Sequence, residues 1–158
     1  MAHSAPRKAR VFVLTISDTR TEADDESGKV CVSMLAGHDV VGKEILRDEP
    51  TLVRERCRAL SSDVDAILLN GGTGISNRDT TYEAVTALLD KRLDGFGELF
   101  RMLSYAEIGS KAMASRAVAG VAGQCLIFCM PGSTKAVRLA MEKLIVPELG
   151  HLVGELCK

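Results

Sequence analysis

The sequence predicts an α/β protein in which helices cover both sides of a parallel sheet. Its strand-like apolar runs are continuous rather than alternating, as in strands that are buried on both faces. These runs also alternate along the chain with segments of helical periodicity. A length of 158 residues suits one domain. We expect residues 10–158 to form that single domain, after a flexible polar tail at 1–9.

Four apolar segments are the predicted strands. They are bounded by polar or glycine-rich stretches, which is typical of short buried strands. Because helical patterns separate them, we expect the four strands to run parallel to one another. The segments are VFVLTI at 11–16, DVVGKEIL at 39–46, DAILLN at 65–70 and CLIFCM at 125–130.

The first three helices are predicted between these strands. Apolar residues at helical spacing follow Ser27, and Gly37 is the expected stop of this first helix. Pro50 precedes the apolar face of the second helix. Thr80 and Glu83 have the spacing of a capping box, so we expect a third helix to begin there, capped by Thr80 or by the threonine after it.

The second half of the chain mixes clear and unclear helical signals. Residues 95–123 are expected to form short helices that are broken by glycines. A regular helical pattern runs from Thr134 to Ile145, and Pro147 is expected to begin a separate last segment. The glycines that should break the middle region are Gly97, Gly109 and Gly120.

Charge and composition restrict the class of protein. The chain has 20 basic and 21 acidic residues, and so lacks the basic excess of a general nucleic-acid binder. The apolar run at 11–16 is too short for a signal-peptide core, and no run reaches the roughly 18 residues of a membrane span. We therefore expect neither a nucleic-acid nor a membrane partner.

The five cysteines show no metal-site spacing and fit a reducing cytoplasm. Four of them fall within apolar patterns, where a free cysteine packs as a small hydrophobic residue. The sequence therefore predicts a cytoplasmic protein with these thiols in its core. The four are Cys31, Cys57, Cys125 and Cys129.

Three predicted strands end in loops that favour a ligand. SDT follows the first strand, GGTG (71–74) follows the third and PGS (131–133) follows the fourth. In open α/β sheets, ligands bind outside the carboxyl ends of the strands. Glycines let backbone N–H groups approach a phosphate closely. A plain tight turn explains any one loop, but three loops at one sheet edge favour a phosphate-bearing ligand.

Two carboxylates are expected at this same edge. Asp48 follows the second strand and Asp79 follows the glycine loop. Two carboxylates with phosphate oxygens and water suit Mg²⁺. In the alternative interpretation, Asp48 is a turn residue and Asp79 is a helix cap or the ion-pair partner of Arg78.

Other catalytic motifs are absent or incomplete. GHDVVGKE at 37–44 has the glycine and lysine spacing of a P-loop, but Glu44 replaces the required serine or threonine. GTGISN has only the first part of a dinucleotide-binding fingerprint. No nucleophile elbow, Cys–His pairing or zinc-protease motif occurs. Any reaction would therefore depend on positioning and electrostatics, as phosphoryl and nucleotidyl transfer do.

Four long motifs together resemble one protein family. These are TISDT, GGTGISNRDTT, FGELFRMLSYAEIGSKAMASRAVAG and MPGSTKA. In this order they are similar to the MoaB/MogA family of molybdenum cofactor biosynthesis proteins, over about residues 10–147. The resemblance implies the molybdopterin-binding fold, a three-layer α/β/α sandwich around a mostly parallel sheet. It also implies a homo-oligomer, either a trimer or a hexamer.

The resemblance further implies an activity and a set of site residues. Active relatives use Mg²⁺ and ATP to adenylylate molybdopterin and release pyrophosphate. Their catalytic and metal-binding acidic pair falls on Asp48 and Asp79. Their positions for binding the nucleotide and the pterin fall on Ser17, Asp18, Gly71, Gly72, Thr73, Gly74, Pro131, Gly132 and Ser133, with Arg78, Glu98 and Ser115 as further polar positions.

Alternatives remain open at this stage. The chain could bind molybdopterin or its precursor without catalysis, or act as an oligomeric scaffold for other proteins of the pathway. The acidic pair favours an enzyme, because a binder needs the loops but not a metal site. Arg78 would either orient Asp79 or offset phosphate charge. For a scaffold, the apolar segments 96–103 and 147–156 would form the contact surface, although packing in the core is the more common role of such faces.

Overall fold

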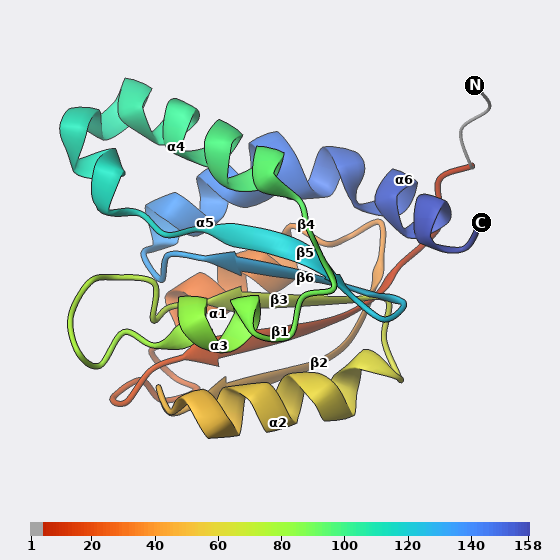
Figure 1. Ribbon diagram of the computed structural model, residues 1–158, viewed down its shortest axis with the longest axis horizontal. Helices are drawn as coiled ribbons and strands as arrows, with labels where there is room; N and C mark the ends of the chain where they lie inside the picture. The colour runs from red at the N-terminus through yellow and green to blue at the C-terminus, as the bar shows by residue number, and fades with distance from the viewer. Residues whose placement is uncertain (1–4) are drawn as a thin grey trace.

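The computed structural model describes residues 5–158 and contains a six-stranded sheet between two layers of helices (Figure 1). The strand order is β2-β1-β3-β6-β5-β4. The first four strands in this order are parallel, whereas β5 and β4 are antiparallel to their neighbours. The predicted fold class is therefore confirmed. The strands are β1 (Arg10–Ile16), β2 (Asp39–Leu46), β3 (Ala66–Asn70), β4 (Lys91–Arg92), β5 (Val118–Ala122) and β6 (Cys125–Met130).

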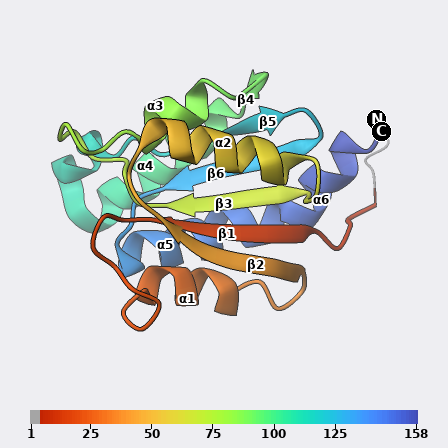
Figure 2. The same cartoon turned by 90° about the horizontal axis from the view of Figure 1, so that it is seen from below.

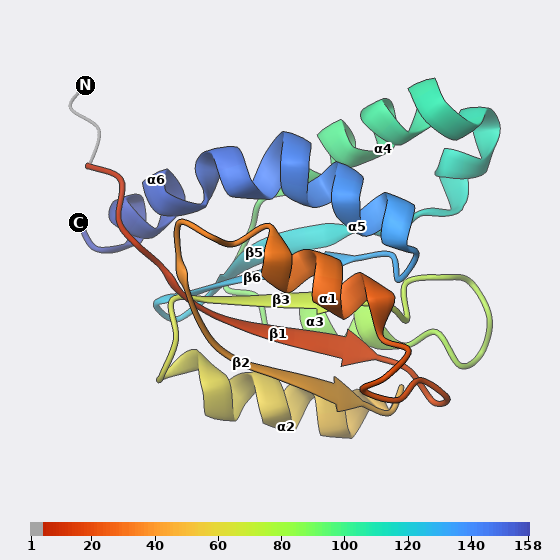
Figure 3. The same cartoon turned by 180° about the vertical axis from the view of Figure 1, so that it is seen from behind.

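The helices divide between the two faces of the sheet. In Figure 1, α4, α5 and α6 lie above the sheet and α2 lies below it. Figure 2 gives a view of the lower layer, and Figure 3 shows α1 packed beside α5 on the upper face. The helices are α1 (Glu26–Ser33), α2 (Pro50–Ser61), α3 (Thr81–Thr86), α4 (Asp94–Ile108), α5 (Thr134–Ala140) and α6 (Val146–Leu156).

Two hydrophobic cores result from the alternation of side chains along the buried strands. In β3, Ala66 and Leu68 belong to the core beneath α1, α4, α5 and α6, whereas Ile67 and Leu69 belong to the core above α2 and α3. All four side chains are fully buried. A strand that is apolar at every position can satisfy both cores, because successive side chains point to opposite faces.

Four of the five cysteines are buried in these cores, as the sequence predicts. Burial raises the pKa of Cys31 and of Cys57 to about 12 each. These thiols are therefore uncharged near neutral pH and pack as hydrophobic groups.

The prediction for residues 95–123 was wrong in two respects. α4 runs from Asp94 to Ile108 without a break at Gly97. Gly97 instead permits a close approach, since a Cβ there would lie 2.7 Å from the Ala117 carbonyl oxygen. Gly109, with φ of +67°, does end the helix, and a 3-10 segment follows it.

The second error concerns the antiparallel side of the sheet, which sequence analysis missed. β4 consists of two exposed basic residues and carries no apolar signal. β5, VAGVA, is short and made of small and β-branched residues. Gly120 lies within β5 and permits its pairing with β4, because a Cβ there would lie 2.3 Å from the Lys91 carbonyl oxygen.

The C-terminal helical region is continuous rather than two segments. α5 passes into a π-helical turn at Met141–Ile145 and then into α6. Pro147 lies in the first turn of α6. Proline has no N–H to donate, and a wider turn before it keeps the helix going without a break. The first helix, in contrast, ends at Ser33, before the predicted stop at Gly37.

The N-terminal segment is held more firmly than the loose tail that the sequence predicts. Of the predicted tail 1–9, residues 1–4 lie outside the described range, and 5–9 form neither helix nor strand. The Arg7 N–H donates to the Gly150 carbonyl, and the Ala9 N–H donates to His38 Nδ1. Ala9 is fully buried. Residues 7–9 are therefore attached to the domain.

Across residues 5–158, no helix is both long enough and apolar enough to cross a membrane.

Candidate functional site

A cleft of about 400 Å³ lies at the carboxyl edge of the parallel strands. The chain leaves β1, β2, β3 and β6 at this edge, so their loops gather at the left of Figure 1. Two of the predicted loops line the cleft together. The lining residues that sequence analysis had proposed are Gly71, Gly72, Thr73, Gly74, Asp79, Ser115, Pro131, Gly132 and Ser133.

The glycine loop takes a path that side chains would block. Gly71 and Gly72 have φ values of +106° and +69°. A Cβ on Gly71 would lie 2.2 Å from the Ile16 carbonyl oxygen. A Cβ on Gly72 would lie 1.9 Å from Thr81 Oγ1 and 2.8 Å from Asp48 Oδ2. The loop can therefore pack closely between the end of β1 and Asp48 only because it has no side chains there.

Asp48 is nearly buried beside this loop. Its Oδ1 accepts hydrogen bonds from the Thr80 N–H at 3.2 Å and the Thr80 hydroxyl at 2.9 Å. The predicted capping box is therefore wrong, because the Thr80 hydroxyl binds Asp48 instead of capping α3. The Thr81 hydroxyl does not cap the helix either, and it is buried without a hydrogen-bond partner.

Asp79 is held by its own loop. Its Oδ2 accepts hydrogen bonds from the Ser76 N–H at 3.1 Å and the Ser76 hydroxyl at 2.6 Å. A Cβ on Gly74 would lie 2.6 Å from the same oxygen, so the carboxylate lies directly against the glycine loop. Since Asp48 binds Thr80, the residue after Asp79, the structure places both carboxylates at the same edge, as expected.

The two carboxylates are of the chemical kind that binds Mg²⁺. Each has one oxygen that is fixed by protein donors, while Asp48 Oδ2 and Asp79 Oδ1 accept no hydrogen bond from residues 5–158. In the same range, no group of three or more His, Cys, Asp or Glu side chains could hold a metal. A two-carboxylate site suits Mg²⁺, which commonly completes its shell with phosphate oxygens and water.

The first loop joins this arrangement through Asp18. Its Oδ1 accepts a hydrogen bond from the Asp48 N–H, and its Oδ2 binds the Arg78 guanidinium at 2.8 and 3.0 Å. The hydrogen bond from Arg78 holds the pKa of the Asp18 carboxyl below its usual value. Arg78 therefore pairs with Asp18 and not with Asp79. Ser17 organises its own turn by accepting from the Thr19 and Arg20 N–H groups.

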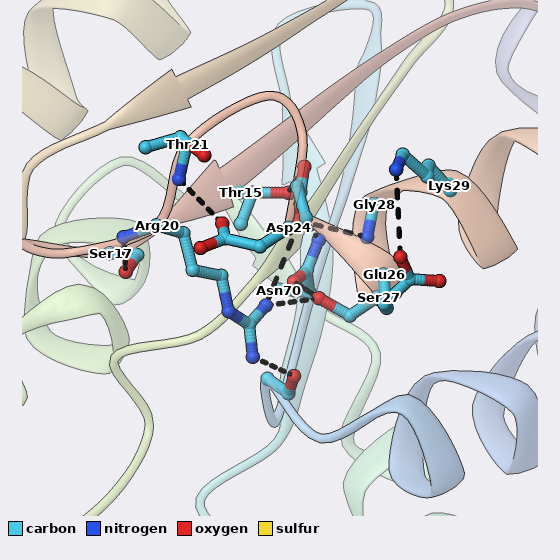
Figure 4. Close-up of polar contacts among 12 residues, drawn as sticks. Thr15, Ser17, Arg20, Thr21, Asp24, Glu26, Ser27, Gly28, Lys29 and Asn70 are labelled. Atoms are coloured by element: carbon cyan, nitrogen blue, oxygen red, sulfur yellow. Dashed lines mark hydrogen bonds and ion pairs between the residues drawn. The ribbon is translucent and has the colours of Figure 1, made fainter.

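A buried polar network lies behind the cleft (Figure 4). Asp25 is fully buried and accepts a 2.6 Å contact from Lys43 Nζ and a 2.9 Å hydrogen bond from Thr15. Burial raises the pKa of Asp25, but Lys43, Thr15 and the Gly28 N–H outweigh it and keep this pKa below its usual value. The carboxylate is thus charged and joins α1 to β1 and β2.

Arg20 connects this network to the cleft. Its guanidinium donates to Ser27 and, at 2.9 Å, to the Gly132 carbonyl oxygen in the loop after β6. Ser27 in turn donates to Asn70, the last residue of β3. Figure 4 shows Arg20, Ser27 and Asn70 converging from different segments. Sequence analysis missed Arg20, because nothing in the local pattern reveals a partner 112 positions away.

The structure leaves five predicted residues out of the cleft lining and adds others. The five are Ser17, Asp18, Asp48, Arg78 and Glu98. Glu98 lines a different, smaller hollow with Arg92 and Arg101. Ser115 lines the cleft, and its hydroxyl is buried without a hydrogen-bond partner, which leaves it available to a polar ligand. Ser104 and Lys111 also line the cleft and were not predicted. Helical periodicity could have placed Ser104 on the face of α4 that carries Phe100.

The fold and the cleft define the class as an α/β protein with a glycine-lined cleft at the carboxyl edge of its parallel strands. Known proteins then give the family. Residues 12–151 match the family model described as "probable molybdopterin binding domain". The chain is 55% identical over 157 residues to molybdenum cofactor biosynthesis protein B of Bacillus cereus, covering 96% of this chain and 93% of that protein.

Solved structures agree with this assignment. A crystal structure of a molybdenum cofactor biosynthesis protein B has a TM-score of 0.92 and 54% identity, with 97% of this chain and 98% of that chain covered. The tungsten cofactor synthesizing protein MoaB of Pyrococcus furiosus has a TM-score of 0.88 and 34% identity, over 98% and 100%. The chain therefore belongs to the molybdopterin-binding domain family.

Gly72→Ala should destabilise the protein strongly. The left-handed backbone costs a non-glycine residue about 1–2 kcal/mol, and the new Cβ would also collide with Thr81. We expect a total loss of at least about 2 kcal/mol in urea unfolding. Gly37→Ala is the control, because a Cβ there meets nothing within 4 Å. Equal stability of the two variants would contradict the close packing of the glycine loop.

Asp25→Asn should lower the free energy of unfolding by about 3 kcal/mol at pH 7, because it leaves Lys43 without its buried partner. The low folded-state pKa stabilises the protein above the unfolded pKa of about 3.9. This stabilisation is lost as pH falls through the folded value, so the two proteins should converge in acid. Urea midpoints from pH 3 to pH 7 measure this.

Glu22→Gln is the matched control for that experiment. Glu22 also contacts Lys43, at 3.3 Å, but its side chain is 74% exposed. An exposed ion pair contributes less than about 1 kcal/mol. If Glu22→Gln proved as damaging as Asp25→Asn, burial of the carboxylate would not be the cause.

Proposed function

We propose that the protein acts in molybdenum cofactor biosynthesis by adenylylating molybdopterin with Mg²⁺ and ATP, with release of pyrophosphate. Relatives named molybdenum cofactor biosynthesis protein B support the pathway. The observation that carries the reaction is the pair Asp48 and Asp79, each with one carboxylate oxygen free, beside a glycine loop.

In this proposal the chain's own residues position the reactants. The backbone of Gly71–Gly74 binds phosphate oxygens, and the loop 131–133 with Ser115 binds the pterin side. A bound Mg²⁺ would be held by Asp48 and Asp79 and would neutralise triphosphate charge. The terminal phosphate oxygen of molybdopterin attacks the α-phosphorus of ATP, and the bond to the β-phosphate breaks. The leaving group is pyrophosphate, and no protein nucleophile is needed.

The second candidate is a protein that binds molybdopterin or its precursor without catalysis. The cleft residues Ser115 and 131–133 would serve a binder equally well. The acidic pair distinguishes the two, since two uncompensated carboxylates would repel an anionic ligand.

The five free cysteines fit the cytoplasm, where we propose that the protein works.

Asp79→Ala should abolish pterin-dependent pyrophosphate release from ATP. We expect a fall of at least roughly 100-fold, the scale seen when a group that stabilises transition-state charge is removed. Pyrophosphate is measured with purified protein, molybdopterin, ATP and Mg²⁺. Glu55→Ala, an exposed carboxylate on α2, is the control and should keep full activity.

Two results would contradict this scheme. Full turnover by Asp79→Ala would remove the metal site from the scheme. No turnover by the unaltered protein, with molybdopterin still bound, would establish the binding protein instead.

We also propose that the protein is a trimer or hexamer. α4 exposes large apolar side chains at intervals of three residues, namely Leu99, Met102, Tyr105 and Ile108. Met102 is 61% exposed. Exposing such a row of apolar side chains to water is unfavourable, and rows of this kind mark protein contact surfaces.

Met102→Lys should weaken this assembly, because it places a charge within the apolar contact. Sedimentation velocity is expected to show a trimer or hexamer for the unaltered protein and smaller species for the variant. Glu107→Lys, at an exposed polar position of α4, should sediment as the unaltered protein does. A monomer for the unaltered protein at micromolar concentration would contradict the proposal.

A further inference from the structure

Arg116 binds the backbone of the glycine loop. Its Nε donates to the Thr73 carbonyl oxygen at 3.1 Å, and one terminal nitrogen donates to the carbonyl oxygens of Gly74 and of Asp79, the latter at 3.0 Å. One guanidinium thus holds three carbonyls at the two ends of the segment 73–79. Arg116 itself does not line the cleft, although Ser115 before it does.

Two side chains of α3 also contact the guanidinium. Glu83 forms an ion pair with it, and the hydrogen bond from Arg116 holds the pKa of the Glu83 carboxyl below its usual value. The guanidinium carbon also lies 5.1 Å from the centre of the Tyr82 ring. The ion pair uses the other terminal nitrogen, so Nε and the nitrogen that holds the Gly74 and Asp79 carbonyls can bind the loop without it.

When a carbonyl oxygen is held by Arg116, the direction of the N–H group in the same peptide is fixed as well. In a trans peptide the C=O and the following N–H point in opposite directions, and the described residues contain no cis bond. Since Thr73 O and Gly74 O face Arg116, the Gly74 and Ile75 N–H groups face away from it. Neither N–H finds an acceptor among residues 5–158. They are two successive donors, the arrangement that forms an anion-binding nest.

The same geometry acts on the acidic pair. Because the Asp79 carbonyl faces Arg116, the Thr80 N–H faces away from it and donates to Asp48. The contact of Arg116 with Asp79 therefore helps to set the position of Asp79 relative to Asp48, without touching either carboxylate.

We propose that Arg116 is a positioning residue that fixes the peptide orientation of the glycine loop. Through it, the Gly74 and Ile75 N–H groups are held ready for a phosphate-bearing ligand, and Asp79 is held beside Asp48. The identity of that ligand as a nucleotide rests on the proposed function. The ordering of the loop by Arg116 does not rest on the proposed function, because it follows from contacts within the chain.

Arg116→Lys tests this role with the charge retained. Lysine has a single ammonium group and cannot reproduce a fork that spans three carbonyls. Backbone amide exchange measured by NMR should rise at least tenfold at Asp79, Thr80 and Thr81, whose N–H groups close the loop. Amides of β3 and β6 should exchange at the unaltered rate.

Glu83→Gln is the matched control. It removes the ion pair on the outer side of Arg116 but leaves all three carbonyl contacts. Exchange at the loop amides should then change by less than twofold. Equal loosening by both variants would show that the ion pair, and not the carbonyl contacts, orders the loop, and would overturn the proposal. An unchanged loop in Arg116→Lys would overturn it as well.

A second readout measures the effect on the ligand. Titration with Mg-ATP by calorimetry should give a dissociation constant at least tenfold weaker for Arg116→Lys and unchanged for Glu83→Gln. Unchanged affinity in Arg116→Lys, with a loosened loop, would overturn the part of the proposal that concerns the ligand. If the unaltered protein does not bind Mg-ATP, the proposed function fails, and the exchange data still decide the role of Arg116 in the loop.

The unaltered protein provides a measurement that needs no variant, in case Arg116→Lys does not fold. The Nε–H of Arg116 should exchange at least tenfold more slowly than that of Arg58, which is exposed on α2. Equal exchange rates for the two side chains would mean that the contact with Thr73 does not persist in solution, and would reject the proposal.

Discussion

The buried carboxylate of Asp25 is the interaction on which the first-strand side of the cleft depends. It lies where β1, β2 and the start of α1 meet, and Lys43 compensates its charge. From there, hydrogen bonds through Thr15, Asn70 and Ser27 reach Arg20 and then the Gly132 carbonyl. Because the Asp25 carboxylate is fully buried, its charge is tolerated only if Lys43 and its hydrogen-bond donors are all in position. The network therefore couples the strand ends to a loop of the site.

Two of the three arginines around the cleft bind backbone carbonyls, and the third forms an ion pair. Arg20 holds the loop after β6, Arg116 holds the glycine loop, and Arg78 is paired with Asp18. Among the described residues that line the cleft, Lys111 is the one cationic side chain. Such an arrangement prepares donors and carboxylates before a ligand arrives, so that less reorganisation accompanies binding.

The sequence predicts the central parallel strands β1, β3 and β6 well, because their continuous apolar runs are typical of strands that are buried on both faces. It does not predict β4 and β5, since Lys91 and Arg92 are exposed and Gly120 serves a close approach that only the third dimension reveals. Gly97 in α4 is misread for the same reason. Local propensity makes it a helix breaker, whereas packing against the Ala117 carbonyl makes it necessary.

The site divides along similar lines. The loops and Asp48 with Asp79 follow from the rule that strand ends meet at one edge, whereas the roles of Thr80, Arg20 and Arg116 depend on partners far away in sequence. The acidic pair carries the remaining step of the argument. Two carboxylates with free oxygens beside the backbone N–H groups of the glycine loop would weaken anion binding unless a cation lay between them. The acidic pair would oppose an anionic ligand alone and favour the same ligand with a metal ion. This behaviour suits the proposed phosphate chemistry better than storage of the pterin.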